Sequence, residues 1–408
     1  MRPKLVVATS FPVWPPRGGG QSRIFGLYGA LARLGVDVDI IALVARQDHG
    51  GKRAIAPGLR QISVPKTIRF EREEYRLHLQ AGVPVTDLAL ALHHRLTPAY
   101  GAALAEAADG ACAVVASHPF AQPALMAATA APLVYEAHNV EADLKASMLA
   151  GSDAPDELRA MVREIEGACC AQSTHTIVCA EDDGARLGEL YGLEPERVVV
   201  VPNGADPASC PYTPPEQRTA RKRALGLQAR FQALFIGSWH EPNLVAVRDV
   251  VAAAEAVSDV GFLVVGSAGV PFTGEHVPSN VDLCGVVDHG FVRSVLSIAD
   301  VALNPMRWGS GTNLKMLDYA LAGVPVISTA FGARGLGLEA GTHYAVMEPD
   351  GLVPALTAFR LGGAEIAAAR AIAAHGRVAE HFAWDSIARR WHDHAAFREL
   401  VHGAVAAG

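Results

Sequence analysis

The sequence lacks an excess of positive charge and lacks the cysteine spacings that hold metal ions. Its 408 residues include 35 lysines and arginines against 42 aspartates and glutamates, a formal net charge of −7. Nucleic-acid-binding proteins usually present a basic face, so we expect no nucleic-acid partner. None of the six cysteines belongs to a CxxC pair, which argues against a zinc ribbon or a redox centre. We therefore expect no metal ion and a reducing, cytoplasmic compartment.

Long apolar runs are also missing. No uninterrupted apolar stretch reaches the length of a membrane span, and the run Leu5–Ala8 is too short for the core of a signal peptide. The expectation is a soluble chain, with peripheral contact to the inner face of the membrane as an open alternative.

Short β-branched runs alternate with longer alanine- and leucine-rich segments along the chain. This alternation is typical of α/β proteins, in which helices connect the strands of parallel sheets. Because the β-branched runs are apolar throughout, helices should cover both faces of each sheet. The expected strands are Leu5–Ala8, Val38–Leu43, Gln61–Val64, Ala113–Ala116, Leu133–Tyr135, Thr176–Cys179, Val198–Val201, Ala233–Ile236, Gly261–Val265, Val281–Leu283, Val301–Asn304 and Val324–Ser328.

Length and proline content indicate where the chain divides. A chain of 408 residues predicts two domains. Asp206–Pro215 contains four prolines in ten residues, which favour a stiff connector over a helix. We therefore expect a first domain at 1–205, a second at 206–384, and a final helix at about 385–408 that packs back on the first domain. Two doubly wound domains would bind their ligand in one cleft between them, at the carboxyl ends of the strands.

The segment after the expected strand Val301–Asn304 has the features of an anion site. Gly309 and Gly311 allow the backbone to approach a ligand closely. Ser310 or Thr312 can cap the helix that follows. The free amides and the dipole at such a helix start favour a phosphate group.

The same helix is expected to carry two charged groups. Gly311, Lys315 and Asp318 share one face, while three leucines occupy the adjacent face and can enter the core. The spacing offers phosphate contacts at the helix start and a carboxylate acceptor for sugar hydroxyls further along. A plain capped helix with a surface ion pair between Lys315 and Asp318 is the alternative.

This segment resembles glycosyltransferase family 4, whose members are retaining enzymes with two Rossmann-like domains facing a cleft, the GT-B fold. The family reads Glu-Gly-x-x-x-x-x-x-Glu, followed by Ala-x-x-Gly-x-Pro-Val. Ser310 replaces the first Glu, and Asp318 replaces the second, which binds the donor ribose in the family. Asn313 replaces the Arg of a sub-branch that reads Gly-Ser-Gly-Thr-Arg-Leu-Lys. The other matching positions are Gly311, Ala320, Gly323, Pro325 and Val326.

Two segments near the first domain's expected borders also resemble the family. The glycine run that includes Gly19 and Gly20 follows the first strand and, by resemblance, approaches the donor diphosphate. Three consecutive glycines there indicate a flexible, backbone-rich loop near a helix start, as phosphate sites require. Arg17 and Arg23 beside it are interpreted as solvated surface residues that can neutralise an anion. The turn at Asn203 is interpreted as a hinge, where the family leaves its first domain.

A histidine follows the expected strand Leu133–Tyr135. By resemblance, His138 lies beside the donor sugar, where its imidazole can bind a hydroxyl group. His118 also follows an expected strand and is the less favoured candidate.

The second half offers further candidates for donor contacts. Gly237 and Gly266 resemble glycines at the ends of the family's strands, and Val287 lies in the short loop that frames the nucleobase. Many relatives carry a basic pair shortly after the first of these glycines, but no lysine or arginine stands there in this sequence. The remaining basic candidates for the diphosphate are Lys315, Arg307 and Arg334.

The resemblance implies a retaining glycosyltransferase that moves a sugar from a nucleotide-sugar donor to an acceptor hydroxyl on a glycan, glycolipid or small metabolite. No DxD-like acidic cluster follows a strand, so this interpretation requires no metal cofactor. Acceptor choice is expected in loops at Arg46–Gly58 and Thr67–Pro84. A non-catalytic nucleotide- or glycan-binding protein and a sugar-nucleotide epimerase are the alternatives. The catalytic candidates are His138, Lys315 and Asp318; the donor-binding candidates are Gly19, Gly20, Gly237, Gly266, Val287, Arg307, Gly309, Ser310, Gly311, Thr312, Asn313 and Arg334.

Overall fold

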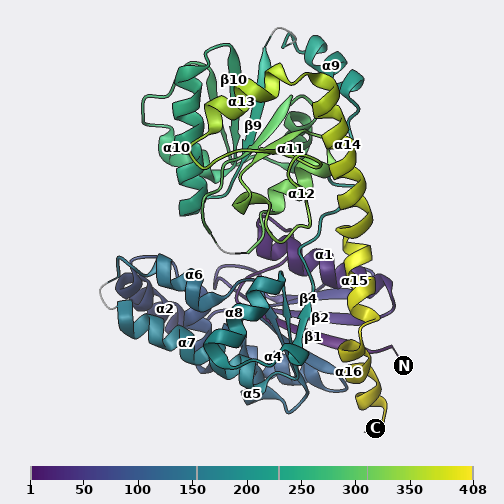
Figure 1. The fold of residues 1–408 in the computed structure, drawn as a ribbon. Helices are drawn as coiled ribbons and strands as arrows, with labels where there is room; N and C mark the ends of the chain where they lie inside the picture. The colour runs from purple at the N-terminus through teal and green to yellow at the C-terminus, as the bar shows by residue number, and fades with distance from the viewer. Residues whose placement is uncertain (1, 153–154, 228–229, 310, 407–408) are drawn as a thin grey trace. The chain divides into compact units, whose positions relative to one another are not determined.

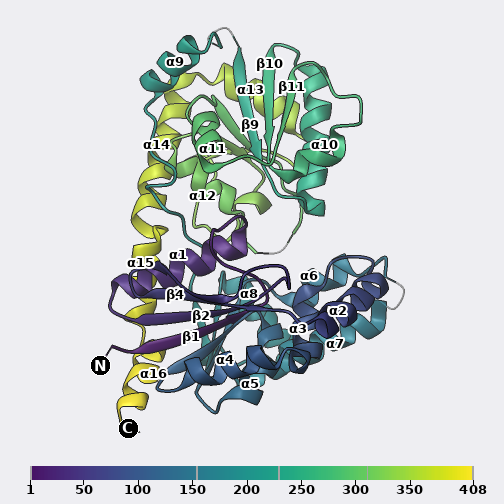
Figure 2. The same ribbon diagram turned by 180° about the vertical axis from the view of Figure 1, so that it is seen from behind.

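The chain folds into two compact α/β units (Figures 1 and 2). The computed structural model describes residues 2–152, 155–227, 230–309 and 311–406. The first unit comprises Met1–Pro202 and Trp384–Gly408, and the second comprises Asn203–Ala383. The proline-rich segment expected as a connector belongs to the second unit, because Cys210 is buried in that unit's core. Cys210 and Thr213 are its buried residues, and the chain passes between the units at Pro202 and again at Ala383.

The described residues of the first unit form an eight-stranded sheet in the order β3-β4-β2-β1-β5-β6-β7-β8. Neighbouring strands are parallel except β3 and β4, which are antiparallel. The strands are β1 (Lys4–Thr9), β2 (Asp37–Val44), β3 (Gly51–Ala56), β4 (Leu59–Pro65), β5 (Ala113–Ser117), β6 (Leu133–Ala137), β7 (His175–Val178) and β8 (Val198–Val200).

Helices cover both faces of this sheet, which confirms the expectation from its continuous apolar strands. Along β1, Leu5 and Val7 join a core with α1, α15 and α16, whereas Val6 and Ala8 join a core with α2, α3, α4, α5, α7 and α8. These opposite faces follow from the alternation of side chains along a strand. The helices are α1 (Gly19–Arg33), α2 (Ile68–Ala81), α3 (Thr86–His93), α4 (Pro98–Ala108), α5 (Gln122–Ala128), α6 (Glu141–Met148), α7 (Pro155–Gln172), α8 (Glu181–Tyr191), α15 (Trp384–His392) and α16 (Ala395–Ala406).

The carboxyl-terminal helices are part of the first unit's core. α15 lies along α1 (Figures 1 and 2), and a Cβ on Gly26 would come within 2.3 Å of the Trp384 indole. Glycine at this position therefore lets the indole approach the helix backbone directly. Trp391 and Phe397 extend the same contact surface into the core.

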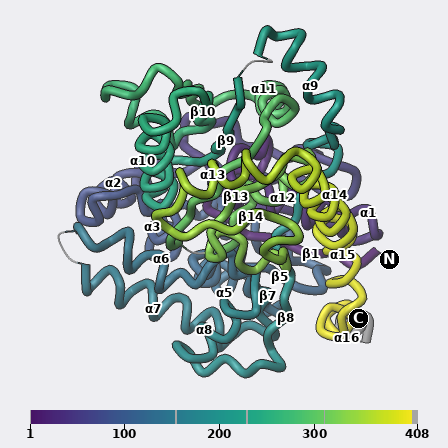
Figure 3. Tube along the Cα trace, turned by 45° about the horizontal axis from the view of Figure 1, so that its top comes forward, coloured from purple at the N-terminus to yellow at the C-terminus, as the bar shows by residue number. Residues whose placement is uncertain are grey.

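The second unit contains a parallel sheet in the order β11-β10-β9-β12-β13-β14 within its described residues. One face packs against α11, α12 and α14, and the other against α10 and α13. Figure 3 shows α13 beside β13 and β14. The elements are β9 (Phe231–Ile236), β10 (Val260–Val265), β11 (Val281–Gly285), β12 (Val301–Asn304), β13 (Val326–Ser328), β14 (Ala345–Val346), α9 (Pro215–Ala224), α10 (Glu241–Ala256), α11 (His289–Leu296), α12 (Leu314–Leu321), α13 (Leu352–Leu361) and α14 (Ala364–His381).

Every expected strand is present, and two further strands, β3 and β14, were not expected. The two segments predicted as loops that choose the acceptor are not loops. β3 lies within Arg46–Gly58, and α2 occupies most of Thr67–Pro84. The hydroxyl of Thr67 accepts a hydrogen bond from the Phe70 amide over 3.2 Å, which caps α2. Apolar residues of α2 then recur on the face that enters the core.

Within the described residues, no single helix is long and apolar enough to cross a bilayer. α13 and α14 meet the test of length and composition only when they are joined, and they are bent by 107° relative to each other.

Candidate functional site

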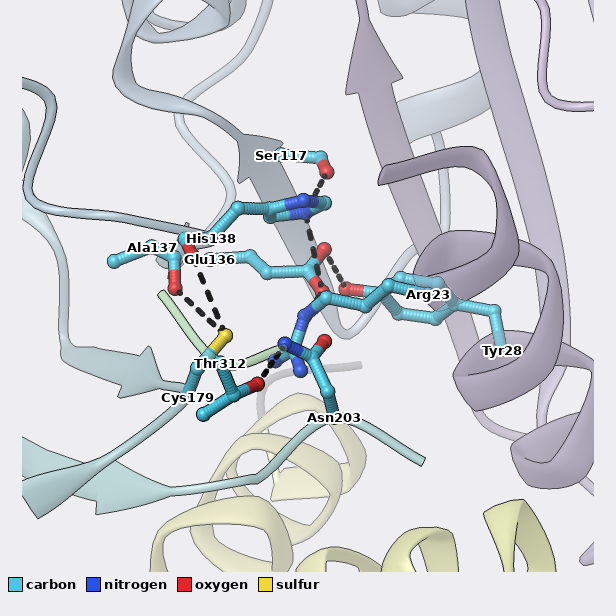
Figure 4. Close-up of polar contacts among 9 residues, drawn as sticks. All are labelled: Arg23, Tyr28, Ser117, Glu136, Ala137, His138, Cys179, Asn203 and Thr312. Atoms are coloured by element: carbon cyan, nitrogen blue, oxygen red, sulfur yellow. Dashed lines mark hydrogen bonds and ion pairs between the residues drawn. The ribbon is translucent and has the colours of Figure 1, made fainter. Parts of the chain in front are cut away.

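A buried polar cluster lies at the carboxyl ends of β5 and β6 in the first unit (Figure 4). Ser117 is the last residue of β5, Glu136 is the last but one of β6, and His138 follows that strand. Arg23 and Tyr28 reach the cluster from α1. Neighbouring parallel strands end at the same edge of the sheet, which is why residues far apart in sequence meet here.

Arg23 is buried and ion-paired, so the interpretation of it as a solvated surface residue is wrong. Its side chain is 1% exposed, and its Nε donates to Oε1 of Glu136 over 2.9 Å. The hydroxyl of Tyr28 donates to Oε2 of the same carboxylate over 2.9 Å. Burial alone would raise the pKa of Glu136, but its interactions with His138 and Arg23 and this hydrogen bond hold that pKa well below its usual range. Arg17, in contrast, is exposed as expected.

His138, the predicted sugar contact, is held by Ser117 and Glu136. Its Nε2 lies 3.0 Å from Oγ of Ser117 and 3.5 Å from Oε1 of Glu136. Burial lowers the pKa of His138 more than the facing Glu136 raises it. The imidazole is therefore neutral at neutral pH and suited to hydrogen bonding with an uncharged group.

His118 lies against His138 and has a strained backbone. The two imidazole centroids are 4.1 Å apart, with the rings tilted by 35°. His118 has a φ of 72°, and no other non-glycine residue in the described part of the chain has a positive φ. Such a conformation costs about 1–3 kcal/mol and persists where the surrounding structure enforces it, often at functional sites. His118 was the less favoured candidate from the sequence. Backbone strain cannot be read from a sequence, so this feature of His118 was not predicted.

The glycines after β1, which we expected in a loop near a helix start, lie in the helix start itself. Gly18 is the N-cap residue of α1, and Gly19 and Gly20 lie in its first turn. Gln21 fixes the preceding segment through hydrogen bonds with two backbone groups. A Cβ on Gly20 would lie 3.5 Å from Nδ1 of His138. One of the two predicted glycines therefore lies directly beside the predicted histidine.

In the second unit, Gly237 and Gly266 lie against each other at the ends of β9 and β10. Gly266 has φ +101°, and a Cβ there would come within 2.2 Å of the Gly237 carbonyl oxygen. The amide of Gly266 donates to the Gly285 carbonyl over 2.8 Å, which links the ends of β10 and β11. Only glycine allows backbones to approach this closely. Val287 follows β11 and packs, partly buried, against the core.

The helix predicted after Gly311 starts later, and its expected side-chain cap is absent. α12 begins at Leu314, with Asn313 as an N-cap residue whose side chain makes no capping hydrogen bond. Gly311 has φ 61° and precedes the helix, so the expected face shared by Gly311 with residues of α12 is wrong. Thr312 also precedes the N-cap position. Ser310 lies outside the described residues.

Two of the predicted donor-binding side chains hold the turn before α12 in place. Oγ1 of Thr312 accepts a hydrogen bond from Nδ2 of Asn203 over 2.8 Å (Figure 4). Nδ2 of Asn313 donates to the Gly332 carbonyl over 3.0 Å. The turn is therefore tied to the segment after β13 and to the start of the second unit.

Lys315 and Asp318 are partly buried on α12, and each has its own internal partner. Nζ of Lys315 donates to Oδ1 of Asn243 over 2.7 Å and lies 4.2 Å from the centroid of the Phe235 ring. Oδ1 of Asp318 accepts a weak hydrogen bond from the Cys210 thiol over 3.7 Å. No ion pair joins Lys315 and Asp318 in the described part of the chain, so the alternative of a surface pair is wrong.

Burial shifts both charges towards neutrality. It lowers the pKa of Lys315 to about 7 and raises the pKa of Asp318 to about 6, the latter against a smaller opposing effect of the Cys210 thiol. A desolvated cation and a desolvated carboxylate without ionic partners gain most when a ligand supplies the missing charge or hydrogen bonds. α12 therefore offers an anion contact in its first turn and a hydroxyl acceptor one turn later.

Arg307, unlike Lys315, is held in ion pairs with acidic side chains of the second unit. Its guanidinium donates to both carboxylate oxygens of Asp249, over 2.7 and 3.2 Å, and also pairs with Asp350. Arg334 lies nearer the turn, where its Nη2 donates to the carbonyl of Gly309 over 3.0 Å. Lys315 is therefore the best placed of the three basic candidates.

Glu136 and Asn243 were not among the predicted site residues. Glu136 interrupts an otherwise apolar strand, a pattern that is visible in the sequence. Arg23 was expected at the surface as an anion contact, not buried against a carboxylate. Nothing local pointed to Asn243 as the partner of Lys315. The described residues contain no group of three histidine, cysteine or acidic side chains that could hold a metal ion.

Two family models match consecutive parts of this chain. Glycosyltransferase Family 4 matches residues 17–209, and Glycosyl transferases group 1 matches residues 230–359. A D-inositol 3-phosphate glycosyltransferase from Xylanimonas cellulosilytica is 27% identical over 77% of this chain and 76% of its own length. One from Acidothermus cellulolyticus is 27% identical over 55% of this chain and 52% of its own length. The chain thus spans only about half the length of several curated relatives that it matches.

Solved structures show the same fold over the whole chain. Sucrose-phosphate synthase from Thermosynechococcus elongatus has a TM-score of 0.74 at 18% identity, with full coverage of both chains. HepE from Anabaena, in complex with UDP-glucose, has a TM-score of 0.65 at 14% identity and covers 99% of this chain and 100% of its own. These similarities confirm the predicted GT-B class with two Rossmann-like units.

Proposed function

The chain belongs to the glycosyltransferases of family 4 and group 1, and we propose that it transfers a sugar from a nucleotide-sugar donor to an acceptor hydroxyl. The observation that carries the proposal is the pair Lys315 and Asp318 on α12. Both side chains are desolvated and lack an ionic partner among the described residues, and both occupy positions that match the family pattern.

The second unit would hold the donor. Lys315 lies in the first turn of α12, after the glycine turn at Gly311, and its ammonium group is suited to the diphosphate. The carboxylate of Asp318 is suited to ribose hydroxyls. The glycines at the ends of β9 and β10 keep the strand ends free of side chains. UDP-glucose is the first donor to test, because HepE, which has the same fold, was solved with it.

The first unit would act on the sugar. His138 is neutral and held in one orientation by Ser117 and Glu136, so it can bind a sugar hydroxyl without reorganisation. The acceptor is a hydroxyl of a glycan, a glycolipid or a small metabolite.

We further propose that the transfer retains the configuration at the anomeric carbon. The departing diphosphate gains negative charge as the glycosidic bond breaks, and Lys315 together with the start of α12 would stabilise that charge. A front-face attack, in which the donor phosphate accepts the proton of the acceptor hydroxyl, needs no carboxylate base from the protein.

A nucleotide-binding protein without catalytic activity is the second candidate. Asp318 is one methylene shorter than the family's Glu, and Ser310 replaces the other Glu of the pattern. Binding of a nucleotide sugar without release of nucleoside diphosphate, in the presence of a panel of sugar and polyol acceptors, would favour this candidate. Conversion of the donor to its epimer with no acceptor present would indicate a sugar-nucleotide epimerase.

A thermal-shift screen with UDP-, GDP-, ADP- and dTDP-linked sugars tests donor binding. We expect one nucleotide to raise the melting temperature well above the others, since ligand binding to the folded state stabilises it.

Asp318→Ala should raise the donor dissociation constant by about tenfold, the loss expected for hydrogen bonds to a charged group. Asp259→Ala, at an exposed carboxylate of the same unit, is the matched control. Unchanged nucleotide binding in Asp318→Ala would remove the ribose contact from the proposal.

A further inference from the structure

The two ring nitrogens of His138 have different surroundings. Nε2 faces the hydroxyl of Ser117 at 3.0 Å and the carboxylate of Glu136 at 3.5 Å (Figure 4). Nδ1 faces the first turn of α1, where a Cβ on Gly20 would lie 3.5 Å away. One nitrogen is therefore occupied by the protein, and the other faces a position without a side chain.

The charge on Glu136 decides which nitrogen carries the proton. Glu136 is paired with Arg23 and accepts a hydrogen bond from Tyr28, so its carboxylate is ionised and can only accept hydrogen bonds. A lone pair on Nε2 would repel this carboxylate, whereas a proton on Nε2 is attracted to it. The neutral imidazole of His138 therefore carries its proton on Nε2 and leaves Nδ1 bare.

Other charged groups near the ring do not reverse this assignment. Arg23, from α1, disfavours a second proton on the ring. His118, stacked on the ring after β5, is held neutral, because burial lowers its pKa well below its ordinary value and His138 adds to the effect. Lys145 of α6 acts on His118 in the same direction. The thiol of Cys179, after β7, donates to the backbone carbonyls of Ala137 and His138.

The backbone does not require glycine at position 20. Gly20 is helical with a negative φ, and alanine favours a helix more than glycine does. A Cβ there would meet Nδ1 of His138 and the ring of Phe11 at 3.5 Å each, which is ordinary van der Waals contact. Alanine would therefore fit, and the effect of glycine is to leave the space beside Nδ1 open.

We propose that Glu136 and Ser117 hold His138 as its Nε2–H tautomer, so that the bare Nδ1 accepts a hydrogen bond from a neutral hydroxyl of the substrate in the space beside Gly20. Glu136 is a positioning residue, which acts through His138. An anionic oxygen brings no proton to a bare nitrogen, so this position selects a sugar or acceptor hydroxyl and rejects a phosphate or carboxylate. The assignment of the hydroxyl rests on the proposed function; the tautomer does not.

Nitrogen-15 NMR of the imidazole rings measures the tautomer directly, with no need for activity. His138→Gln identifies the signals of His138 among those of the 16 histidines. We expect a protonated Nε2 and a bare Nδ1 in the wild-type chain at neutral pH. Glu136→Gln keeps the size of the side chain and removes its charge, so the Nδ1–H tautomer should become populated.

Kinetics with UDP-glucose separate positioning from binding. In Glu136→Gln, we expect kcat for release of UDP to fall about tenfold or more, because the wrong tautomer is populated, while the donor KM changes by less than about threefold. In Gly20→Ala, the tautomer and the melting temperature should be retained, and kcat should fall by about the same factor because a methyl group fills the space beside Nδ1. Gly29→Ala, on the same helix with no neighbour closer than 3.8 Å to the added Cβ, should keep the wild-type kcat.

Two results would overturn the proposal. One is an Nδ1–H tautomer or an imidazolium at neutral pH in the wild-type chain. The other is a wild-type kcat in Gly20→Ala. If Glu136→Gln does not fold, the wild-type spectrum and Gly20→Ala decide the question. If the wild-type chain releases no nucleoside diphosphate from any nucleotide sugar of the screen, this result contradicts the proposed function instead. The NMR measurement of the tautomer then tests the proposal by itself.

Discussion

The candidate sites of the two units differ in whether their buried charges have ionic partners. In the first unit, Arg23 and Glu136 neutralise each other, and a hydrogen bond from Tyr28 to the carboxylate adds to the pairing. In the second unit, Lys315 and Asp318 lie on one helix without an ionic partner among the described residues, and burial moves the pKa of each towards neutrality. The first cluster has found its partners within the chain, whereas the second has charges that a ligand would complete.

This difference separates stability from binding. Removing one member of a satisfied buried pair leaves an uncompensated charge in a dry environment, which is costly. Removing a desolvated charge that has no ionic partner relieves a cost that the folded chain bears until ligand binds. Loss of the cation from the Arg23–Glu136 pair should therefore act mainly on stability, and loss of a charge from the pair on α12 mainly on donor binding and turnover.

The largest expected effect is on folding, from Arg23→Met. Methionine keeps most of the volume but leaves Glu136 buried without its cation, so the free energy of unfolding should fall by about 3–5 kcal/mol. Urea denaturation followed by circular dichroism measures this change. Arg33→Met is the matched control, because Arg33 lies on the same helix and pairs with Asp385 at a site where the two side chains are 56% and 66% exposed. It should change stability by less than about 1 kcal/mol.

The double variant Arg23→Met with Glu136→Gln sharpens this test. Removing both charges should recover part of the stability lost in Arg23→Met, since no buried charge is then left unpaired. Equal losses for Arg23→Met and Arg33→Met would contradict the contrast between the two units.

The next effect is on turnover, from Lys315→Ala. The free energy of unfolding should stay the same or rise, because a desolvated ammonium group is removed. Turnover of the donor chosen by the screen should fall about tenfold or more, the scale of a lost charge-assisted contact in a dry site. Lys52→Ala, at an exposed lysine that pairs with Glu106, is the control. Near-wild-type turnover in Lys315→Ala would move the diphosphate contact to another residue, with Arg334 next in line.

The fold could be predicted from the sequence wherever burial on both faces makes a strand continuously apolar. β1 and β5 are such strands, and each lies where we expected it. β3 lies at the edge of its sheet with most of its residues exposed, and β14 has only two residues. Neither carries the apolar signal that central strands require, which is why both were missed.

The sites could be predicted only in part, because a sequence motif shows residue types and not their partners. The expectations for His138 and Lys315 came from residues that follow strands or start a helix. The burial of Arg23 arises from Glu136, which lies 113 residues away in sequence, and no local pattern reveals such a pair. The late start of α12 has a local cause that was underestimated: Gly311 takes a left-handed φ, which interrupts helical geometry before Leu314.

The smallest expected effect is a pH dependence of donor binding that arises from the two charged groups on α12. Donor binding needs Lys315 protonated and Asp318 ionised. Lys315 has its pKa lowered to about 7, so affinity should fall as the pH rises through this value. Asp318 has its pKa raised to about 6, so affinity should fall as the pH drops through that value. Burial lowers the pKa of His138 below its ordinary value, so its ring is neutral on the alkaline side of this window and adds nothing to the fall there.

Isothermal titration of the donor between about pH 5 and pH 9 should therefore give a bell-shaped affinity with its maximum near pH 6.5. From the two pKa values, the association constant at about pH 8 should be about sixfold below the maximum, with a similar loss at about pH 5. A nucleotide sugar is the right probe, since its diphosphate is esterified at both ends and lacks the second ionisation near pH 6 of a terminal phosphate. Lys315→Arg should abolish the alkaline fall, because a guanidinium stays charged throughout. An affinity that is flat from pH 6 to pH 8 in the wild-type chain would mean that neither charge on α12 meets the donor, and the contrast between the units would then rest on stability alone.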